Sequence, residues 1–227
     1  MLALHGWRRD HSDFSLLLRE PTPLSAVAVD LPGFGGTPAP AEAWGSADYA
    51  EALVPLLEKM SAPCVVLGHS FGGRVAVHLG AAHPEAVRAL VLTGVPLYPP
   101  SGRRAKPPLV YRSVRRLRRA GLLSEDRMEL FRQRYGSADY RAASGVMRGT
   151  LVRLLAEDYE PPLRALRCPV ELVWGDADSE APLEVAERAC TTLGGSCRLT
   201  VVHGAGHMTP LTAPRELRAA LERCGDA

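Results

Sequence analysis

The sequence predicts an α/β protein with a mostly parallel sheet of about six strands, flanked by helices. Two observations lead to this prediction. Several β-prone runs, such as 64–68 and 87–93, are apolar at nearly every position, which is typical of strands buried on both faces. Segments of helical periodicity follow these runs in turn, and that alternation is the pattern of a parallel sheet covered by helices.

The first part of the sheet lies within residues 1–95. We expect strands at 1–4, 25–30, 64–68 and 87–93, and helices at 12–19, 46–60 and 71–83. Ser46 is the expected N-cap of the second helix, because a serine hydroxyl can accept a hydrogen bond from a free backbone amide. Pro84 marks the end of the third helix.

Residues 96–162 interrupt this alternation, and we expect them to form a helical cap. They show no strand pattern, and helical periodicity recurs at 109–120, 124–135 and 139–156. The α/β pattern then resumes, with strands at 170–174 and 197–202 and helices at 182–193 and 213–224. The predicted organisation is therefore one core domain, formed by 1–95 and 163–227, with a cap at 96–162.

Composition excludes several classes of protein. The chain has 227 residues, of which 46% are hydrophobic and 23% charged, as in an ordinary globular protein and unlike a disordered one. No apolar run approaches the length of a membrane span, and no signal peptide is visible. The five cysteines are scattered, so we expect neither a disulfide framework nor a zinc site, and a cytoplasmic location.

Basic residues are concentrated in one place. The net charge is only +2, but residues 101–124 carry eight basic side chains and no acidic one. A nucleic-acid-binding protein would spread this excess more widely and interleave it with aromatic residues, so we expect no nucleic-acid partner. One interpretation is a solvated outer face of the cap. Another is a docking surface for an anionic substrate group, a phosphopantetheine arm or a carrier protein. A third is attachment to a membrane surface or to nucleic acid, which the lack of interleaved aromatic residues on this face disfavours.

The segment Gly68-His69-Ser70-Phe71-Gly72-Gly73 carries the clearest chemical signal. It joins a predicted apolar strand to a predicted helix, which is the context of a nucleophile elbow. In such an elbow the serine occupies a strained turn, its hydroxyl projects above the sheet, and the flanking glycines allow strand and helix to approach closely. Ser70 is thus the predicted nucleophile.

A serine needs a base, and His207 is the best candidate because it follows the last predicted strand in a run of small residues. His203 precedes it by four residues, which is the spacing of a metal-binding pair on a helix. The intervening glycines favour a loop and no third ligand is nearby, so we expect no metal site here. Asp176 and Asp178, directly after a strand, are the candidates for the carboxylate that orients the base. The order Ser, Asp, His is that of the α/β-hydrolases.

The third feature is His5-Gly6-Trp7 at the end of the first strand. A tetrahedral intermediate needs two converging donors, and the Phe71 amide at the start of a helix is one. The Trp7 amide is the expected second donor of this oxyanion hole. All of these residues fall at strand ends on one edge of the predicted sheet, where α/β proteins bind their ligands.

With these motifs, the sequence resembles the α/β-hydrolase superfamily over nearly its whole length. The matching segments are the H-G-x loop at 5–7, the D-x-x-G-x-G-x-T loop at 30–37 and the elbow at 68–72. In the family's G-x-x-D pattern the acid falls on Asp178. The resemblance implies an α/β-hydrolase fold with a Ser70–His207–Asp178 triad, and Ser70 excludes the relatives that use an aspartate nucleophile.

Two departures from the family pattern bear on the site and the sheet. Glu180 stands where an apolar residue is usual and would add negative charge near the acid loop. The two antiparallel strands that normally precede the oxyanion strand are not found, so we expect the sheet to lack its first hairpin. An edge left open in this way could be short or could pair with another chain, which leaves the oligomeric state open.

The predicted function is hydrolysis of a small carboxylic ester through an acyl-enzyme, without metal or organic cofactor. The alternatives are a lactone, a CoA or carrier-protein thioester or a carbon–carbon bond as substrate for the same triad, and a degenerate hydrolase acting as a ligand receptor or interaction module. The expected partner is a small acyl substrate, with anionic ones included. The residues expected to contact it are His69, Met208, Tyr111 and Tyr140.

Overall fold

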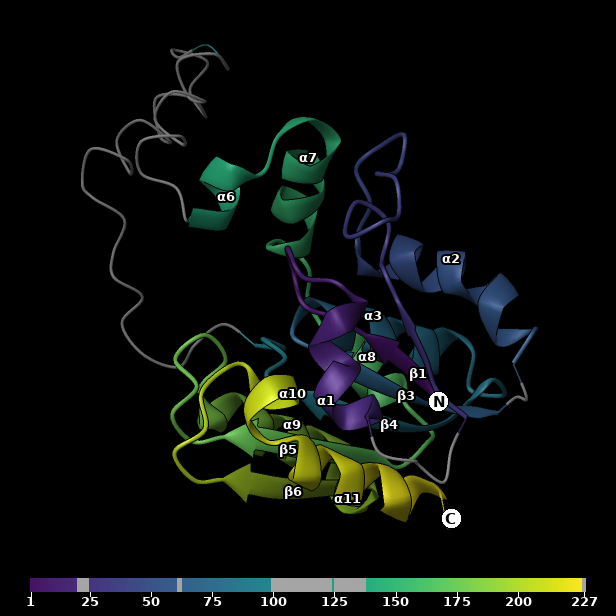
Figure 1. The fold of residues 1–227 in the computed structure, drawn as a ribbon, viewed down its shortest axis with the longest axis vertical. Coiled ribbons are helices and arrows are strands. Elements are labelled where there is room, and N and C mark those ends of the chain that lie inside the picture. Colours follow the sequence, from purple (N-terminus) through teal and green to yellow (C-terminus); the bar gives the residue numbers. More distant parts are fainter. Residues whose placement is uncertain (20–24, 61–62, 99–123, 125–137, 226–227) are drawn as a thin grey trace.

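A computed structural model of the chain describes residues 1–19, 25–60, 63–98, 124 and 138–225. Within them, six strands form a single sheet in the order β2-β1-β3-β4-β5-β6, and all neighbouring strands are parallel (Figure 1). The strands are β1 (Leu2–Leu4), β2 (Val27–Val29), β3 (Cys64–His69), β4 (Val87–Thr93), β5 (Val170–Gly175) and β6 (Cys197–Val202). The predicted parallel α/β sheet is confirmed.

Helices connect the strands and cover both faces of the sheet. They are η1 (His11–Phe14), α1 (Ser15–Leu18), α2 (Ser46–Leu57), α3 (Phe71–Ala82), α6 (Ala138–Ala142), α7 (Gly145–Leu154), α8 (Glu160–Ala165), α9 (Leu183–Leu193), η2 (Gly194–Ser196), α10 (Thr209–Thr212) and α11 (Pro214–Gly225). Successive residues of β3 face opposite sides: Val66 packs with the side chains of α2, α3 and α9, whereas Leu67 packs with those of α1 and α11. This two-sided burial explains the continuous apolar runs in the sequence.

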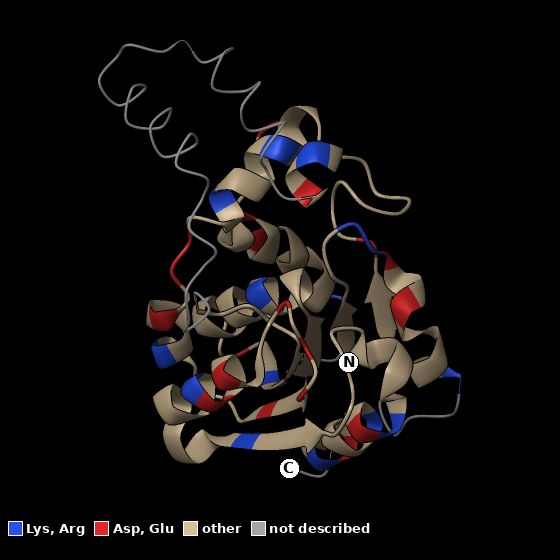
Figure 2. Ribbon diagram, turned by 90° about the vertical axis from the view of Figure 1, so that its left-hand side faces the viewer, with Lys and Arg blue, Asp and Glu red and all other residues tan. Residues whose placement is uncertain are grey.

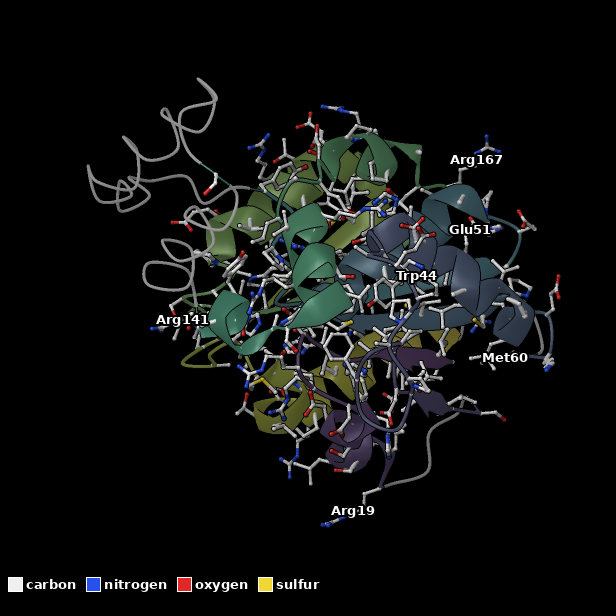
Figure 3. The ribbon with its side chains drawn as sticks, turned by 90° about the horizontal axis from the view of Figure 1, so that it is seen from above. Arg19, Trp44, Glu51, Met60, Arg141 and Arg167 are labelled. Carbon is white, nitrogen blue, oxygen red and sulfur yellow. A yellow bond between two sulfur atoms is a disulfide. The ribbon has the colours of Figure 1, made fainter. Side chains whose placement is uncertain are left out.

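Helices α6 and α7 lie apart from the two covering layers, beyond the upper edge of the sheet (Figure 1). Basic and acidic residues both occur on the helices at this end of the molecule (Figure 2). Seen from above, α7 lies over the sheet, and Arg141 of α6 is at the periphery (Figure 3). The predicted helix over 139–156 is therefore divided, and the break falls before Gly145, whose φ is +51°. The helices expected at 109–120 and 124–135 and the basic segment 101–124 lie outside the described residues, apart from the exposed Ser124.

The predicted N-cap of α2 is wrong by one residue. Gly45 is the N-cap, and its amide donates to the Asp48 carboxylate at 2.7 Å. The Ser46 hydroxyl is instead 3.0 Å from the Tyr159 hydroxyl, which ties α2 to the segment before α8. Helix α8 spans the expected cap boundary at residue 162 and packs against α3 and α9.

The sequence predicts no disulfide framework, and this prediction is wrong for one pair of cysteines. Cys190 in α9 and Cys197 at the start of β6 form a disulfide, while Cys64, Cys168 and Cys224 are buried free thiols. The turn between α9 and β6 brings the two residues together, a proximity that the spacing of seven did not reveal. No helix in the described part of the chain has both the length and the apolar character needed to cross a membrane.

Candidate active site

Ser70 lies in the turn between β3 and α3. Its φ of +50° and ψ of −113° are unfavourable for a side-chain-bearing residue, so the surrounding backbone must hold the turn in place. Two glycines permit this arrangement. A Cβ on Gly68 would lie 2.5 Å from the Gly73 Cα, and one on Gly72 would lie 2.2 Å from the Leu4 carbonyl oxygen. β3, α3 and β1 therefore approach one another more closely than residues with a Cβ at these two positions would allow.

Three predicted side chains form a continuous hydrogen-bonded line. The His207 Nε2 is 3.1 Å from the Ser70 Oγ, and the His207 Nδ1 is 2.9 Å from an Asp178 oxygen. The other Asp178 oxygen accepts from the backbone amides of Glu180 at 2.8 Å and Ala181 at 2.9 Å. A carboxylate held in this way accepts the Nδ1 hydrogen, which leaves Nε2 as the acceptor that faces Ser70.

Burial and charge act against each other on this pair. Burial lowers the pKa of His207, but the hydrogen bond and charge of Asp178, with the charge of Glu180, outweigh it, so the pKa lies above its ordinary value of 6.5. Burial raises the pKa of the Asp178 carboxyl, but its hydrogen bonds and the charge of His207 bring that pKa below 3.8. The pair thus consists of an ionised carboxylate beside a basic imidazole.

The start of α3 is fastened to the loop after β1. The Gly72 amide donates to the His5 carbonyl oxygen at 3.0 Å, and the Trp7 and Phe71 rings pack edge to face, with their centroids 5.6 Å apart. His5 itself is buried; one ring nitrogen lies 2.7 Å from the Gly6 carbonyl oxygen, and the other accepts from the Leu31 amide at 2.9 Å. These contacts bring the Phe71 and Trp7 segments, which carry the two expected oxyanion donors, to the same end of the sheet.

A cavity of about 600 Å³ opens beside Ser70 and His207. Its walls come from the loop after β1, from α3, from the segment after β4 and from residues 151–159. Among the described residues, neither the Trp7 nor the Phe71 amide donates to a backbone carbonyl, and both residues line this cavity. The hydroxyl, the imidazole and the two amide-bearing segments therefore face one space that could hold a small molecule.

The four predicted substrate contacts differ in position. Met208 lines the cavity. His69 also borders it but is buried; its Nε2 donates to the His207 carbonyl oxygen at 3.0 Å, and burial lowers its pKa to about 4. Tyr140 packs with Ala143, Leu151 and Trp7 and does not line the cavity. Tyr111 lies outside the described residues. Of the three that the structure describes, Met208 and His69 therefore border the cavity and Tyr140 does not.

Sequence reasoning missed two residues that line the cavity: Arg74, one turn into α3, and Tyr159, which precedes α8. The Arg74 guanidinium donates to the carbonyl oxygens of Pro96 and Leu154 and lies 5.0 Å from the centre of the Tyr159 ring. Arg74 is four residues after Ser70, so helical spacing could have placed it on the same face. Nothing in the local sequence signals Tyr159, because its partners are distant along the chain.

The remaining titratable clusters have their own partners. His203 pairs with Asp176 and His207 with Asp178, so the two histidines do not form a shared metal site. Among the described residues, Asp10, His11 and Asp30 alone bring three potential ligand atoms within 4.8 Å of one another. Backbone amides already occupy these carboxylates: Asp30 accepts from those of His11 and Gly36, and Asp10 accepts from that of Ser12. The cluster is explained as a loop anchor.

Comparison with known families and proteins gives a consistent result. Residues 1–220 match the family described as Alpha/beta hydrolase family. A pimeloyl-[acyl-carrier protein] methyl ester esterase of Aromatoleum aromaticum is 30% identical over 250 residues, which cover 98% of this chain and 96% of that protein. Lipase LipV of Mycobacterium tuberculosis is 40% identical over 93 residues, 40% of this chain and 35% of that protein.

Solved structures share the fold at lower identity. An esterase from Thermogutta terrifontis has a TM-score of 0.71 at 22% identity, over 98% of this chain and 87% of that one. A bromoperoxidase from Bacillus anthracis has a TM-score of 0.73 at 21% identity, over 100% and 91% of the two chains. At these identities the likeness concerns the fold alone.

Proposed function

The chain belongs to the alpha/beta hydrolase family and is a hydrolase that acts on ester bonds; on that premise, we propose that it cleaves small carboxylic esters through an acyl-enzyme. The observation that carries the proposal is the line of hydrogen bonds from Ser70 through His207 to Asp178. It couples a nucleophile to a base and the base to an orienting carboxylate, which is the arrangement that ester hydrolysis requires.

In the first half of the reaction, the Ser70 Oγ attacks the ester carbonyl carbon and His207 Nε2 takes its proton. Asp178 stabilises the imidazolium that forms and keeps Nε2 directed at the serine. The tetrahedral intermediate then collapses: the bond from carbon to the alcohol oxygen breaks, and His207 Nε2 gives its proton to the departing alcohol. The acyl group stays on Ser70.

In the second half, water takes the place of the alcohol. His207 Nε2 accepts a proton from the water as its oxygen attacks the acyl carbonyl, and the proton returns to Ser70 as the acid leaves. In both halves the carbonyl oxygen becomes negative, and we assign its stabilisation to the backbone amides of Phe71 and Trp7. Phe71 begins α3, where the helix dipole adds to the favourable potential.

A carrier-linked methyl ester is the specific substrate that one relative aligned over nearly its full length favours. The Aromatoleum aromaticum protein, whose name describes that activity, aligns over 98% of this chain. The basic run at 101–124 provides charge for docking an anionic carrier protein. A fivefold or greater preference in kcat/KM for a carrier-bound acyl methyl ester over the free acyl methyl ester would support this substrate, and equal values would oppose it.

Covalent labelling tests the proposed mechanism directly. A fluorophosphonate should label the wild-type protein at Ser70, and Ser70→Ala should show no labelling. With p-nitrophenyl acetate, the wild type should release p-nitrophenol in a burst that matches the enzyme concentration, provided that deacylation is the slower step. No labelling of the folded wild type, or equal labelling of the variant, contradicts the serine mechanism and favours a ligand-binding role for the fold.

A further inference from the structure

Six charged side chains line the cavity in addition to His207: Arg8, Arg9, Arg74, Asp139, Glu157 and Glu180. The first five have partners in the protein. Arg8 pairs with Asp139, and Arg9 pairs with Asp13. Arg74 donates to two carbonyl oxygens, and Glu157 accepts from the Ser46 amide and the Tyr159 hydroxyl. The Glu180 carboxylate differs, since it accepts no hydrogen bond from any described residue. Its charge is therefore available to a molecule in the cavity.

The acid loop delivers Glu180 to the reactive side of His207. Asp178 binds His207 Nδ1 with one oxygen and the Glu180 amide with the other. This places the Glu180 carboxylate 3.6 Å from His207 Nε2, the same atom that contacts Ser70. The imidazole thus lies between two carboxylates. The Glu180 side chain is 69% exposed, so its orientation leaves room for a substrate group beside it.

His207 Nε2 is the atom that gives a proton to the departing alcohol in the proposed reaction. The alcohol oxygen must come within about 3 Å of Nε2, and the atoms attached to that oxygen then lie next to the Glu180 carboxylate. A positive charge on the alcohol would be attracted there, and a negative charge would be repelled. The charge of Glu180 affects the acyl group of the ester less than the alcohol, because the acyl group remains bonded to Ser70.

We propose that Glu180 is a specificity-determining residue for the leaving group and selects esters of cationic alcohols, such as amino alcohols, over neutral and anionic ones. This inference rests on the proposed ester hydrolysis. The cationic alcohol that it names as the leaving group is an alternative to the methanol that a carrier-linked methyl ester would release. Two unit charges about 4 Å apart in a water-exposed setting attract by an energy that corresponds to about fivefold in rate or affinity. That factor is the expected preference attributable to Glu180.

An isosteric pair of substrates isolates this effect. Acetylcholine and 3,3-dimethylbutyl acetate have the same acyl group and the same alcohol shape, and they differ in one positive charge. The ratio of their kcat/KM values should fall about fivefold in Glu180→Gln, and Glu180→Asp should restore part of it. Added salt at about 0.5 M should reduce the wild-type ratio, because exposed charges are screened.

Glu184→Gln is the matched control. It removes the same charge from an exposed residue four positions later, at the start of α9 and outside the cavity lining. Its ratio should stay within twofold of the wild type. If Glu180 acted only through the basicity of His207, Glu180→Gln would change both substrates by the same factor, and this result would overturn the proposal.

The proposal and the function on which it rests fail in different ways. Hydrolysis of the neutral ester by the wild type, with the same ratio in Glu180→Gln, overturns the role of Glu180 and leaves ester hydrolysis intact. Absence of hydrolysis of either ester, together with no fluorophosphonate labelling of Ser70, overturns both.

Discussion

Two histidine–aspartate pairs join the same two loops of this protein. Asp176 and Asp178 follow β5, whereas His203 and His207 follow β6. In each pair a histidine Nδ1 lies 2.9 Å from an aspartate oxygen. By distance and residue type the two pairs are equivalent, so the features that separate them reveal what a hydrolytic site requires.

The pairs differ in burial and in what lies beyond the histidine. The His203 and Asp176 side chains are 88% and 34% exposed, and those of His207 and Asp178 are 12% and 1% exposed. Asp176 also accepts from the Gly204 amide at 2.7 Å, so it anchors the turn after β6. We call His207 and Asp178 the inner pair and His203 and Asp176 the outer pair. Only the inner pair continues to a serine, and its low exposure strengthens the attraction between the imidazole and the carboxylate. The outer pair, His203 and Asp176, is an exposed contact that solvent screens.

Substitution of the two histidines should give the largest contrast. His207→Ala removes the base and should lower kcat for p-nitrophenyl acetate by about 10⁴-fold or more. His203→Ala should keep kcat within twofold, since its ring has no route to Ser70. Steady-state rates of both variants, with circular dichroism to verify folding, measure the contrast. A comparable loss in the two folded variants would remove the distinction between inner and outer pairs.

The aspartates should repeat the contrast at smaller size. Asp178→Asn keeps the shape but leaves the imidazolium without its compensating charge, and kcat should fall by about 10³- to 10⁴-fold. Asp176→Asn should leave kcat within about twofold and should lower the free energy of unfolding only slightly, because solvent screens this exposed pair. Urea denaturation and steady-state rates provide the two readouts. A loss above 100-fold in folded Asp176→Asn would mean that Asp176, and not Asp178, orients the base.

The inner pair could be predicted from the sequence, and the outer pair could not. The spacing from Gly175 selects Asp178, and a position after the last strand selects His207. The same spacing gives no reason for Asp176 to meet His203, because that contact depends on the path of two loops. The sequence predicts that Glu180 adds negative charge near the acid loop. Its carboxylate lies 3.6 Å from His207 because the Glu180 backbone amide donates a hydrogen bond to the Asp178 carboxylate, and no sequence pattern encodes that contact.

The fold shows the same division between local and distant information. The apolar runs identified β3, β4 and β5 to within one residue, since each of these strands is buried on both faces. The bounds predicted for β6 are also correct, although this edge strand is partly exposed. The N-cap of α2 was misplaced because Ser46 is engaged by Tyr159, a residue far along the chain. The disulfide was missed for a similar reason: Cys190 and Cys197 meet only after α9 has turned back towards β6.

The pH dependence of activity should respond to the His207–Asp178 pair and not to the His203–Asp176 pair. His207 must be neutral to accept the Ser70 proton, and its pKa is raised above 6.5 because Asp178 and Glu180 outweigh burial. Activity should therefore rise with pH through that raised pKa and be lost below it. In kcat/KM profiles, Glu180→Gln should move this midpoint to lower pH, and Asp176→Asn should leave it in place. An upward shift in Glu180→Gln would contradict the assigned charge effect.

The smallest effect on activity should come from the opposite end of β6. Cys197 begins that strand, whereas His203 and His207 follow its last residue, so the disulfide anchors the end of the strand far from both pairs. Replacing Cys190 and Cys197 with serine should lower the free energy of unfolding by about 2 kcal/mol, the value expected for so short a loop. Because the hydrogen bond to Asp178 holds His207 in place, kcat should stay within twofold. Reduction of the wild-type protein with dithiothreitol should reproduce both results, and a tenfold loss of kcat would mean that the position of His207 depends on the far end of its strand.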